Sequence, residues 1–291
     1  MSLLAVLATV APVFALIALG AGFSAWRRVD IATLTDVVVY LGGPALVFRA
    51  LVEADVGARE TAQLVAGTIT VVIGSGGLAV LATRALGVRL GAMLLPAMFM
   101  NAGNMLLPLS LFAFGQAGLE RAAIILVVVV ALHSTIGVAI ATGTWTWMEI
   151  FRLPYFYALL GALAVRVLRA DLPAVLARPV NLLGDMAIPL MLIALGSRLR
   201  LVRGGSWRRP LFITGVRLFG GFLLGLSFAE LAGLAGTARG CLVLASAMPA
   251  AVVNFVFAER YENEAAEVAM AVVASTCASV VTTPLVLWVA S

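Results

Sequence analysis

Two asparagines inside an apolar stretch are the residues of this sequence best suited to bind a solute. Asn101 and Asn104 lie in AMFMNAGNMLLPLSLFAFG, residues 97–115, which also contains Gly103 and Pro108. A carboxamide can donate a hydrogen bond to a carboxylate. Lipid offers it no partner, so it survives in a membrane only against protein or a wet cavity. This stretch therefore favours the binding of an anion.

The same stretch predicts a broken helix. Pro108 has no N–H, so the carbonyl of Asn104 loses its helical partner, and Gly103 lets the chain leave helical geometry cheaply. The start of a half-helix carries unpaired N–H groups and a positive dipole end, which attract anions. We expect the break near mid-membrane, where transporters with broken helices hold a substrate. A simple proline kink, with the asparagines bonded to a neighbouring helix, is the alternative.

The composition is that of a polytopic helical membrane protein. Of 291 residues, 63% are hydrophobic and 11% charged, whereas soluble domains carry about a quarter charged residues. Apolar runs with short charged gaps fit about ten spans of about 20 residues. The net charge of +5 could suggest nucleic acid, but arginines at helix ends are explained more simply by membrane orientation, so we expect a lipid bilayer and no nucleic acid as partner.

The predicted spans follow the apolar runs, and residues 144–152 are predicted to be a connector at the membrane surface. After the fourth span, a polar turn is expected at residues 116–121. The spans are residues 3–23, 31–51, 61–81, 97–115, 122–143, 154–168, 180–196, 211–231, 238–258 and 267–289.

The ninth span echoes the fourth. It contains Pro249 and Asn254, and residues 255–266 (FVFAERYENEAA) align with residues 112–123 (FAFGQAGLERAA), although the two prolines are out of register. Both segments predict the end of a broken helix, a polar turn and the start of the next span. The alignment therefore suggests an internal repeat.

Two five-span repeats, residues 1–143 and 153–291, would enter the membrane from opposite faces because five is an odd number. The two broken helices then meet near the centre. Basic residues favour one face, chiefly through the loop after the seventh span, and both termini are expected outside the inner (plasma) membrane. That loop contains Arg198, Arg200, Arg203, Arg208 and Arg209.

Four ionisable residues inside predicted spans are candidates for coupling or charge: Asp36, Asp185, His133 and Arg217. For the two aspartates we favour an interfacial cap or ion pair over a coupling site. The lone histidine is expected to be hydrogen-bonded structure rather than a proton shuttle. Arg217 is costly in lipid, so it is expected to snorkel to the basic side, the alternative being a counter-charge facing the cavity.

No group of residues resembles a metal site, a nucleophile elbow or a phosphate loop. Cys241 and Cys277 fall within predicted spans and are expected to be buried thiols. An embedded enzyme needs a compact acid, base or metal constellation, and none is apparent, so we predict no enzyme activity, no metal and no cofactor. The acidic residues after the ninth span are predicted to form a solvated loop: Glu259, Glu262, Glu264 and Glu267.

Three stretches resemble the auxin efflux carrier family, which includes the plant PIN carriers and bacterial organic-acid permeases. NAGNMLLPL, followed by AFG, is similar to the family's broken fourth helix; MPAAVVNFVFAERY, residues 248–261, is similar to its broken ninth, and residues 279–285 fit its tenth span. The resemblance implies an all-α fold of ten spans in inverted repeats, like that of sodium–proton antiporters and bile-acid transporters. Spans one, two, six and seven would form a scaffold that often mediates homodimers, and the others a transport domain that moves as an elevator.

By motif match, Asn101 corresponds to the family's asparagine that contacts the substrate carboxylate, and Pro108 and Pro249 to its crossover prolines. The chain lacks the long central loop of plant members, and Asn254 stands where they have a second proline. A dicarboxylate therefore fits better than an indole acid. The predicted substrate site comprises Asn101, Gly103, Asn104, Met105, Pro108, Pro249 and Asn254.

The residues and the resemblance together predict a secondary transporter of small organic anions, carboxylates such as dicarboxylates or auxin-like acids, that works by elevator-type alternating access and holds its substrate where spans four and nine cross. Three alternatives to this prediction stay open: a sodium-coupled organic-anion symporter of the bile-acid type, a channel and a membrane-embedded enzyme. The sequence does not fix the substrate, the coupling ion or the direction of transport.

Overall fold

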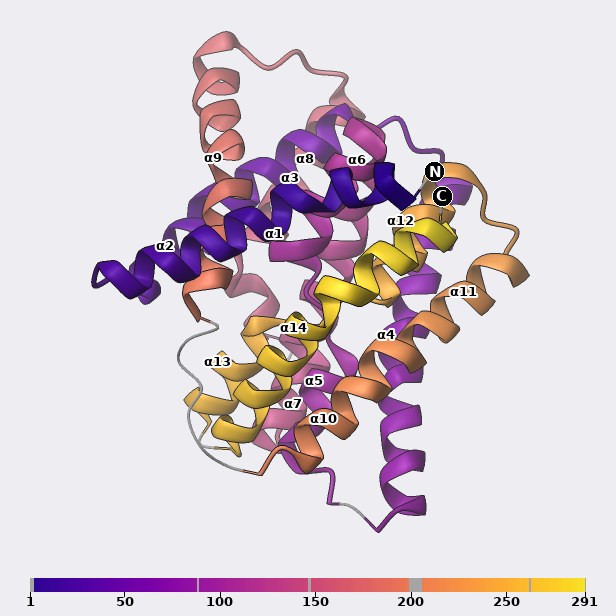
Figure 1. Cartoon of the computed structure of the whole chain (residues 1–291). Helices are drawn as coiled ribbons and strands as arrows, with labels where there is room; N and C mark the ends of the chain where they lie inside the picture. The colour runs from indigo at the N-terminus through magenta and orange to yellow at the C-terminus, as the bar shows by residue number, and fades with distance from the viewer. Residues whose placement is uncertain (1–2, 88, 146–147, 199–205, 262, 291) are drawn as a thin grey trace.

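The regular structure of this computed structural model is helical over the residues it describes, which are 3–87, 89–145, 148–198, 206–261 and 263–290 (Figure 1). Short 3-10 turns are η2 (Gly91–Met93) and η5 (Met148–Arg152), and π-helical turns are η1 (Val38–Gly42), η3 (Ala102–Leu106), η4 (His133–Gly137) and η6 (Val216–Gly220). The α-helices are α1 (Leu3–Trp26), α2 (Ile31–Val37), α3 (Gly43–Glu53), α4 (Ala58–Ala85), α5 (Leu94–Met98), α6 (Leu107–Leu132), α7 (Val138–Thr142), α8 (Pro154–Leu168), α9 (Ala174–Arg198), α10 (Arg208–Gly215), α11 (Gly221–Leu231), α12 (Gly236–Ser246), α13 (Val252–Arg260) and α14 (Ala265–Ala290). The predicted all-α class is confirmed. Arg200, Arg203 and Glu262 lie outside the described residues.

Long apolar helices dominate the described part of the chain. Seven helical runs there are long and apolar enough to cross a bilayer, and α8 is a shorter apolar helix. The runs are Leu4–Trp26, Ile31–Glu53, Ala58–Ala85, Ala102–Thr142, Ala174–Arg198, Arg208–Leu231 and Ala265–Ala290. Length and composition therefore fit a chain that crosses the membrane several times.

The run Ala102–Thr142 covers most of the predicted fourth span and nearly all of the predicted fifth. Its 41 residues correspond to about 60 Å of helix, twice the roughly 30 Å of a hydrocarbon core. The polar turn expected at residues 116–121 is wrong, because these residues are helical and Glu120 is buried. The interruption falls at Gly115 instead, where φ is 65° and ψ is −156°, a conformation that glycine adopts without steric penalty.

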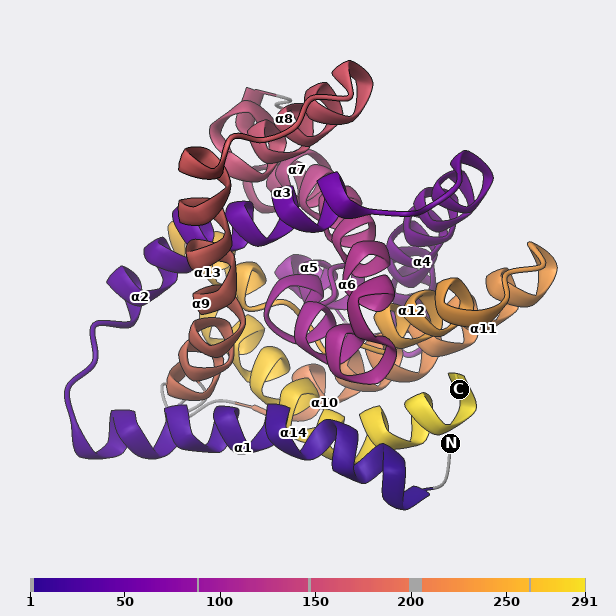
Figure 2. The same cartoon turned by 90° about the horizontal axis from the view of Figure 1, so that it is seen from above.

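The helices pack in two groups. In the first helix group (α1, α2, α3, α8 and α9), α9 packs along α1 and against α2, while α3 packs against α8 and α9. In the second helix group (α4 to α7 and α10 to α14), α6 packs against α4 and α12, and α14 against α10, α12 and α13. Figure 2 shows the second group around α5 and α6, with α1, α2 and α9 along its edge. The start of α1 lies beside the end of α14 (Figures 1 and 2).

Small residues allow α1 and α9 to approach closely. A Cβ atom at Gly196 would clash with the carbonyl of Ile17, and one at Gly20 with the carbonyl of Ile193. The Ser197 hydroxyl donates to the carbonyl of Gly20 at 3.1 Å. Small residues at helix contacts are the usual means of close packing in membranes, where helix association gains little from the hydrophobic effect.

This crossing predicts a stability difference between two glycines. Gly196→Val forces α1 and α9 apart and should cost at least about 1–3 kcal/mol, the range for overpacking, seen as a lower apparent Tm in detergent. Gly22→Val is the control because a Cβ at Gly22 would meet no atom within 4 Å. Equal Tm values for the two variants would contradict the packing.

Candidate functional site

The first helix break follows α5. This helix ends at Met98, Phe99 is extended (φ −99°, ψ 110°), and the π-helical turn η3 begins after Asn101. The side-chain oxygen of Asn101 accepts a hydrogen bond from the Asn104 N–H at 3.0 Å and so caps η3. Pro108 is the second residue of α6, a position where its missing N–H costs little. The predicted broken helix is confirmed.

The second break separates α12 from α13. Helix α12 ends at Ser246 and α13 begins at Val252, and Pro249 lies between them. The N–H of Ala250 donates to the hydroxyl of Ser275, on α14, at 3.1 Å. Sequence reasoning did not identify Ser275, because a serine in an apolar span gives no sign of which segment it contacts.

The two breaks lie side by side as an antiparallel backbone bridge between Met100 and Ala250. The Asn101 N–H donates to the Pro249 carbonyl at 2.7 Å, and the Ala251 N–H donates to the Phe99 carbonyl at 2.9 Å. We call this pairing the crossover. Each break thus supplies hydrogen bonds that lipid cannot provide.

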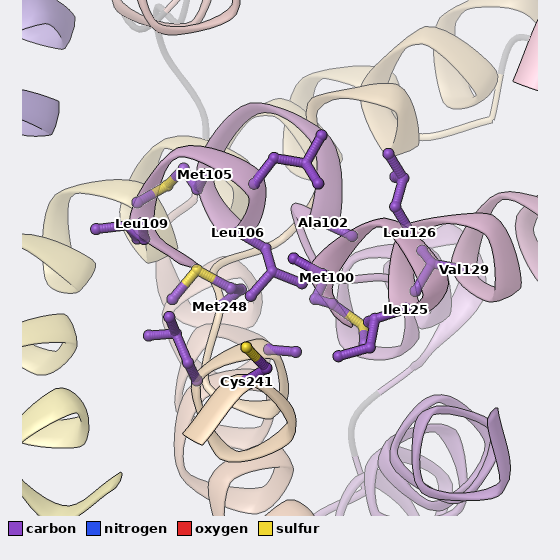
Figure 3. Packing of buried hydrophobic residues seen from close by; sticks show 14 of the residues in the cluster. Met100, Ala102, Met105, Leu106, Leu109, Ile125, Leu126, Val129, Cys241 and Met248 are labelled. Carbon is purple, nitrogen blue, oxygen red and sulfur yellow. The ribbon is translucent and has the colours of Figure 1, made fainter. Parts of the chain in front are cut away.

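An apolar layer surrounds the crossover. Figure 3 shows Leu106 and Met248 pointing toward one another, and Met100 toward Ile125. These four side chains are buried. They keep water from the bridge, which strengthens its hydrogen bonds.

The two crossover asparagines use their amides differently. Asn254 is fully buried, and its Nδ2 donates to the Phe99 carbonyl at 3.0 Å, which leaves Oδ1 without a partner in the described part of the chain. Asn101 is 3% exposed, and its Oδ1 caps η3 while Nδ2 has no partner among the described residues. The free group of Asn101 is therefore a donor, and the free group of Asn254 is an acceptor.

Open space lies over the first turn of η3. Gly103 and Asn104 are half-buried, and a Cβ at Gly103 would meet only Leu126 Cδ1, at 3.9 Å. Met105 and Pro108, by contrast, are buried. Of the predicted substrate-site residues in the first repeat, Gly103 and Asn104 are therefore the ones that lie beside free volume.

Arg217 does not snorkel to the basic side, and that expectation is wrong. Its side chain is fully buried, and it donates to the carbonyls of Ala97 at 3.2 Å, Met98 at 2.9 Å and Ser246 at 2.5 Å. These carbonyls end α5 and α12. The guanidinium thus joins the two half-helices on the carboxyl side of the crossover.

His133 also lies at the crossover. Its ring stacks on Phe99, with centroids 4.2 Å apart and planes 6° apart, and the edge of Phe257 lies 4.7 Å away. The residue is 6% exposed, and its Nε2 has no hydrogen-bond partner among the described residues. Nε2 therefore lacks the hydrogen bond expected of a structural histidine, and that expectation is wrong for this atom. Aromatic packing holds the ring against the break instead.

The two aspartates lie on the first helix group. Asp185 is exposed, with 66% of its side chain accessible, and forms an ion pair with Arg49 at 2.7 Å, as the interfacial interpretation predicts. Asp36 is exposed on α2, next to Thr35, whose hydroxyl accepts from Arg198 at 2.8 Å. Neither aspartate belongs to the crossover.

Two of the acidic residues predicted to form a solvated loop, Glu264 and Glu267, instead bond to other segments of the chain, so that prediction is wrong for them. Glu264 accepts from the Ala92 N–H at 2.9 Å and pairs with Arg209 at 3.1 Å, and Glu267 pairs with Arg209 at 2.8 Å. They hold the segment before α5 against α10 and α14.

Cys241 is buried as expected, but Cys277 is exposed, so the expectation of two buried thiols is wrong for Cys277.

A cavity of about 420 Å³ lies away from the crossover, between α3, α4, α6 and α8. Its lining is almost entirely apolar, with Arg166 at one side. Arg166 donates to the carbonyl of Leu51 at 3.1 Å and to that of Ala54 at the end of α3. The cavity contains none of the predicted site residues and marks the boundary between the two helix groups.

Comparison with known protein families assigns the chain to a family of membrane transporters. The family model described as "Membrane transport protein" matches residues 138–287, just over half of the chain. The match includes Arg217, Pro249 and Asn254, whereas the Asn101 segment precedes it. No curated protein matches the chain. The match and the repeated apolar helices establish a multi-pass membrane transporter, and the chain belongs to the membrane transport protein family, that of the auxin efflux (PIN-like) carriers.

Proposed function

We propose that this protein is a secondary transporter that moves small organic anions by alternating access and holds them at the crossover. The observation that carries the proposal is the free Nδ2 donor of Asn101. A buried donor without a partner costs about 1–3 kcal/mol. A carboxylate in the space beside Gly103 would relieve that cost.

The charge distribution at the crossover supports an anionic substrate. Helix ends carry about half an elementary charge, positive at the amino end and negative at the carboxyl end. Arg217 neutralises the carboxyl ends of α5 and α12. The amino ends that start at Asn101 and Val252 keep their positive potential, so the crossover attracts an anion.

The arrangement of the helices supports an elevator mechanism. In this proposal the chain has ten spans in two inverted repeats, residues 1–143 and 153–291, joined by the connector 144–152. The first helix group (spans one, two, six and seven) acts as a scaffold and possible homodimer surface, and the second (spans three to five and eight to ten) carries the substrate past it. The packing within each group supports this division. The start of α1 lies beside the end of α14, as expected if the number of spans is even. In this proposal both termini lie outside the inner membrane.

A small carboxylate suits the site better than a large aromatic acid. The free volume adjoins Gly103 and Asn104, while Met105, Pro108 and Asn254 are buried. In this proposal the Asn101 and Asn104 amides bind the substrate, and Asn254 positions Phe99. We therefore favour a dicarboxylate.

Asn101→Ala should lower transport by about 10- to 100-fold, because a hydrogen bond to a charged group contributes about 1.5–3 kcal/mol. The assay is uptake of radiolabelled succinate, malate and indole-3-acetate into proteoliposomes, preceded by a thermal-shift screen of an organic-acid library to select the probe. Asn181→Ala, at an exposed asparagine of α9, controls for the loss of an amide. Native-level uptake by Asn101→Ala would remove this residue from the site.

Gly103→Leu should block transport while leaving stability intact, since its side chain enters the free volume beside Asn104. The expected result is loss of uptake with an apparent Tm close to native. Gly77→Leu is the control, because a Cβ at Gly77 meets no atom within 4 Å. Full uptake by Gly103→Leu would place the substrate elsewhere.

A further inference from the structure

The unusual feature of Arg217 is that its hydrogen-bond partners are backbone carbonyls. It is the largest fully buried side chain of the described residues. Among those residues no carboxylate forms an ion pair with it, and the Ala97, Met98 and Ser246 carbonyls accept its hydrogen bonds. A buried cation is costly in a membrane unless its surroundings carry compensating negative charge. The carboxyl ends of two half-helices supply that charge.

The surrounding chain is shaped to hold this side chain. A Cβ at Gly221 would clash with Arg217 Nη2 and the Ser246 carbonyl, and one at Gly225 with the Ser246 hydroxyl. Arg217 itself lies in the π-helical turn η6, a feature that occurs frequently at functional sites. The close approach of α11 to the end of α12 thus depends on glycines that leave room for the guanidinium.

Carbonyls at the carboxyl ends of interrupted helices are also the ligands with which transporters coordinate a coupling sodium ion. The Ala97, Met98 and Ser246 carbonyls converge from two such ends, and the guanidinium occupies the point where they meet. One positive charge there balances two ends of about half a negative charge each.

We propose that Arg217 is a resident cation of the crossover: it takes the place that a coupling sodium ion would occupy, so that anion transport by this protein needs no sodium at these carbonyls. This inference rests on the proposed function for its transport consequence. The assignment of the carbonyl cluster as a cation site stands on geometry alone. It also separates this protein from the sodium-coupled symporter alternative.

The test compares the native protein with R217K, R217Q and R217A in nanodiscs and proteoliposomes. R217K keeps the positive charge, R217Q keeps a donor without charge, and R217A opens the carbonyl cluster. R27A is the control, because Arg27 is an exposed arginine stacked over Trp26.

The stability measurement does not depend on transport. Replacing sodium chloride by choline chloride should leave the apparent Tm of the native protein and of R27A unchanged. R217Q should lose more Tm than R217K, and the Tm of R217A should rise with sodium or with non-denaturing guanidinium, as expected for a ligand that binds the folded state. If R217A fails to fold, the R217K and R217Q pair still tests the charge. Equal Tm losses in that pair, or native Tm values in R217Q, would overturn the proposal.

The transport measurement uses the probe anion selected above. Native uptake should be the same in sodium and choline, and R217A should lose uptake and regain it with guanidinium. Native uptake that disappears without sodium would overturn the resident-cation proposal while supporting anion transport. Absence of native uptake for every probe would reject the proposed function, and the stability measurement would still decide the role of Arg217.

Discussion

The backbone of an interrupted helix must find hydrogen-bond partners inside the bilayer, and the rest of this structure depends on how that requirement is met. Water is absent there, and each unsatisfied amide or carbonyl costs several kcal/mol. Here each break pairs with the other through Asn101 and Ala251, while Asn254 and Ser275 bond to Phe99 and Ala250. The crossover is thus first a means of satisfying the backbone, and the proposed binding site is built on it.

The same requirement separates the crossover into two sides. On the carboxyl side, carbonyls converge and Arg217 binds them. On the amino side, Asn101 caps η3 through Oδ1, and its Nδ2 has no partner within the described part of the chain. One arginine therefore holds the two half-helices together, and in the proposed function it also leaves the opposite side electrostatically suited to an anion.

The sequence predicts the breaks and their partnership well. Asn101, Gly103 and Pro108 in an apolar stretch are incompatible with a continuous membrane helix, and the echo of this stretch around Pro249 indicates that two such breaks belong together. The position of the turn after the fourth span is less predictable: a single glycine, Gly115, supplies it, while the more polar residues that follow are helical.

The residues that sequence reasoning misplaced are those whose partners are distant backbone groups or aromatic rings. For Arg217 the cost of charge in lipid is visible in the sequence, but carbonyls that belong to two remote helices are not. For His133 the sequence predicts a hydrogen-bonded ring, whereas Phe99 and Phe257 pack against it. The sequence predicts a solvated Glu264, since nothing in it shows that the partners of this residue, Ala92 and Arg209, come from other segments.

A disulfide between the two breaks tests the crossover most directly. Opposed residues in such a pair have Cα atoms about 4.5 Å apart, within the roughly 4.4–6.8 Å range of disulfides. Met100→Cys with Ala250→Cys, in a background with Cys241→Ala and Cys277→Ser, should therefore oxidise with copper phenanthroline to a cross-linked peptide seen by mass spectrometry. Met100→Cys with Gly22→Cys should not, since a side chain at Gly22 meets no neighbour. If both thiols of the Met100–Ala250 pair stay fully alkylatable after oxidation, the two broken helices do not meet and the crossover does not exist.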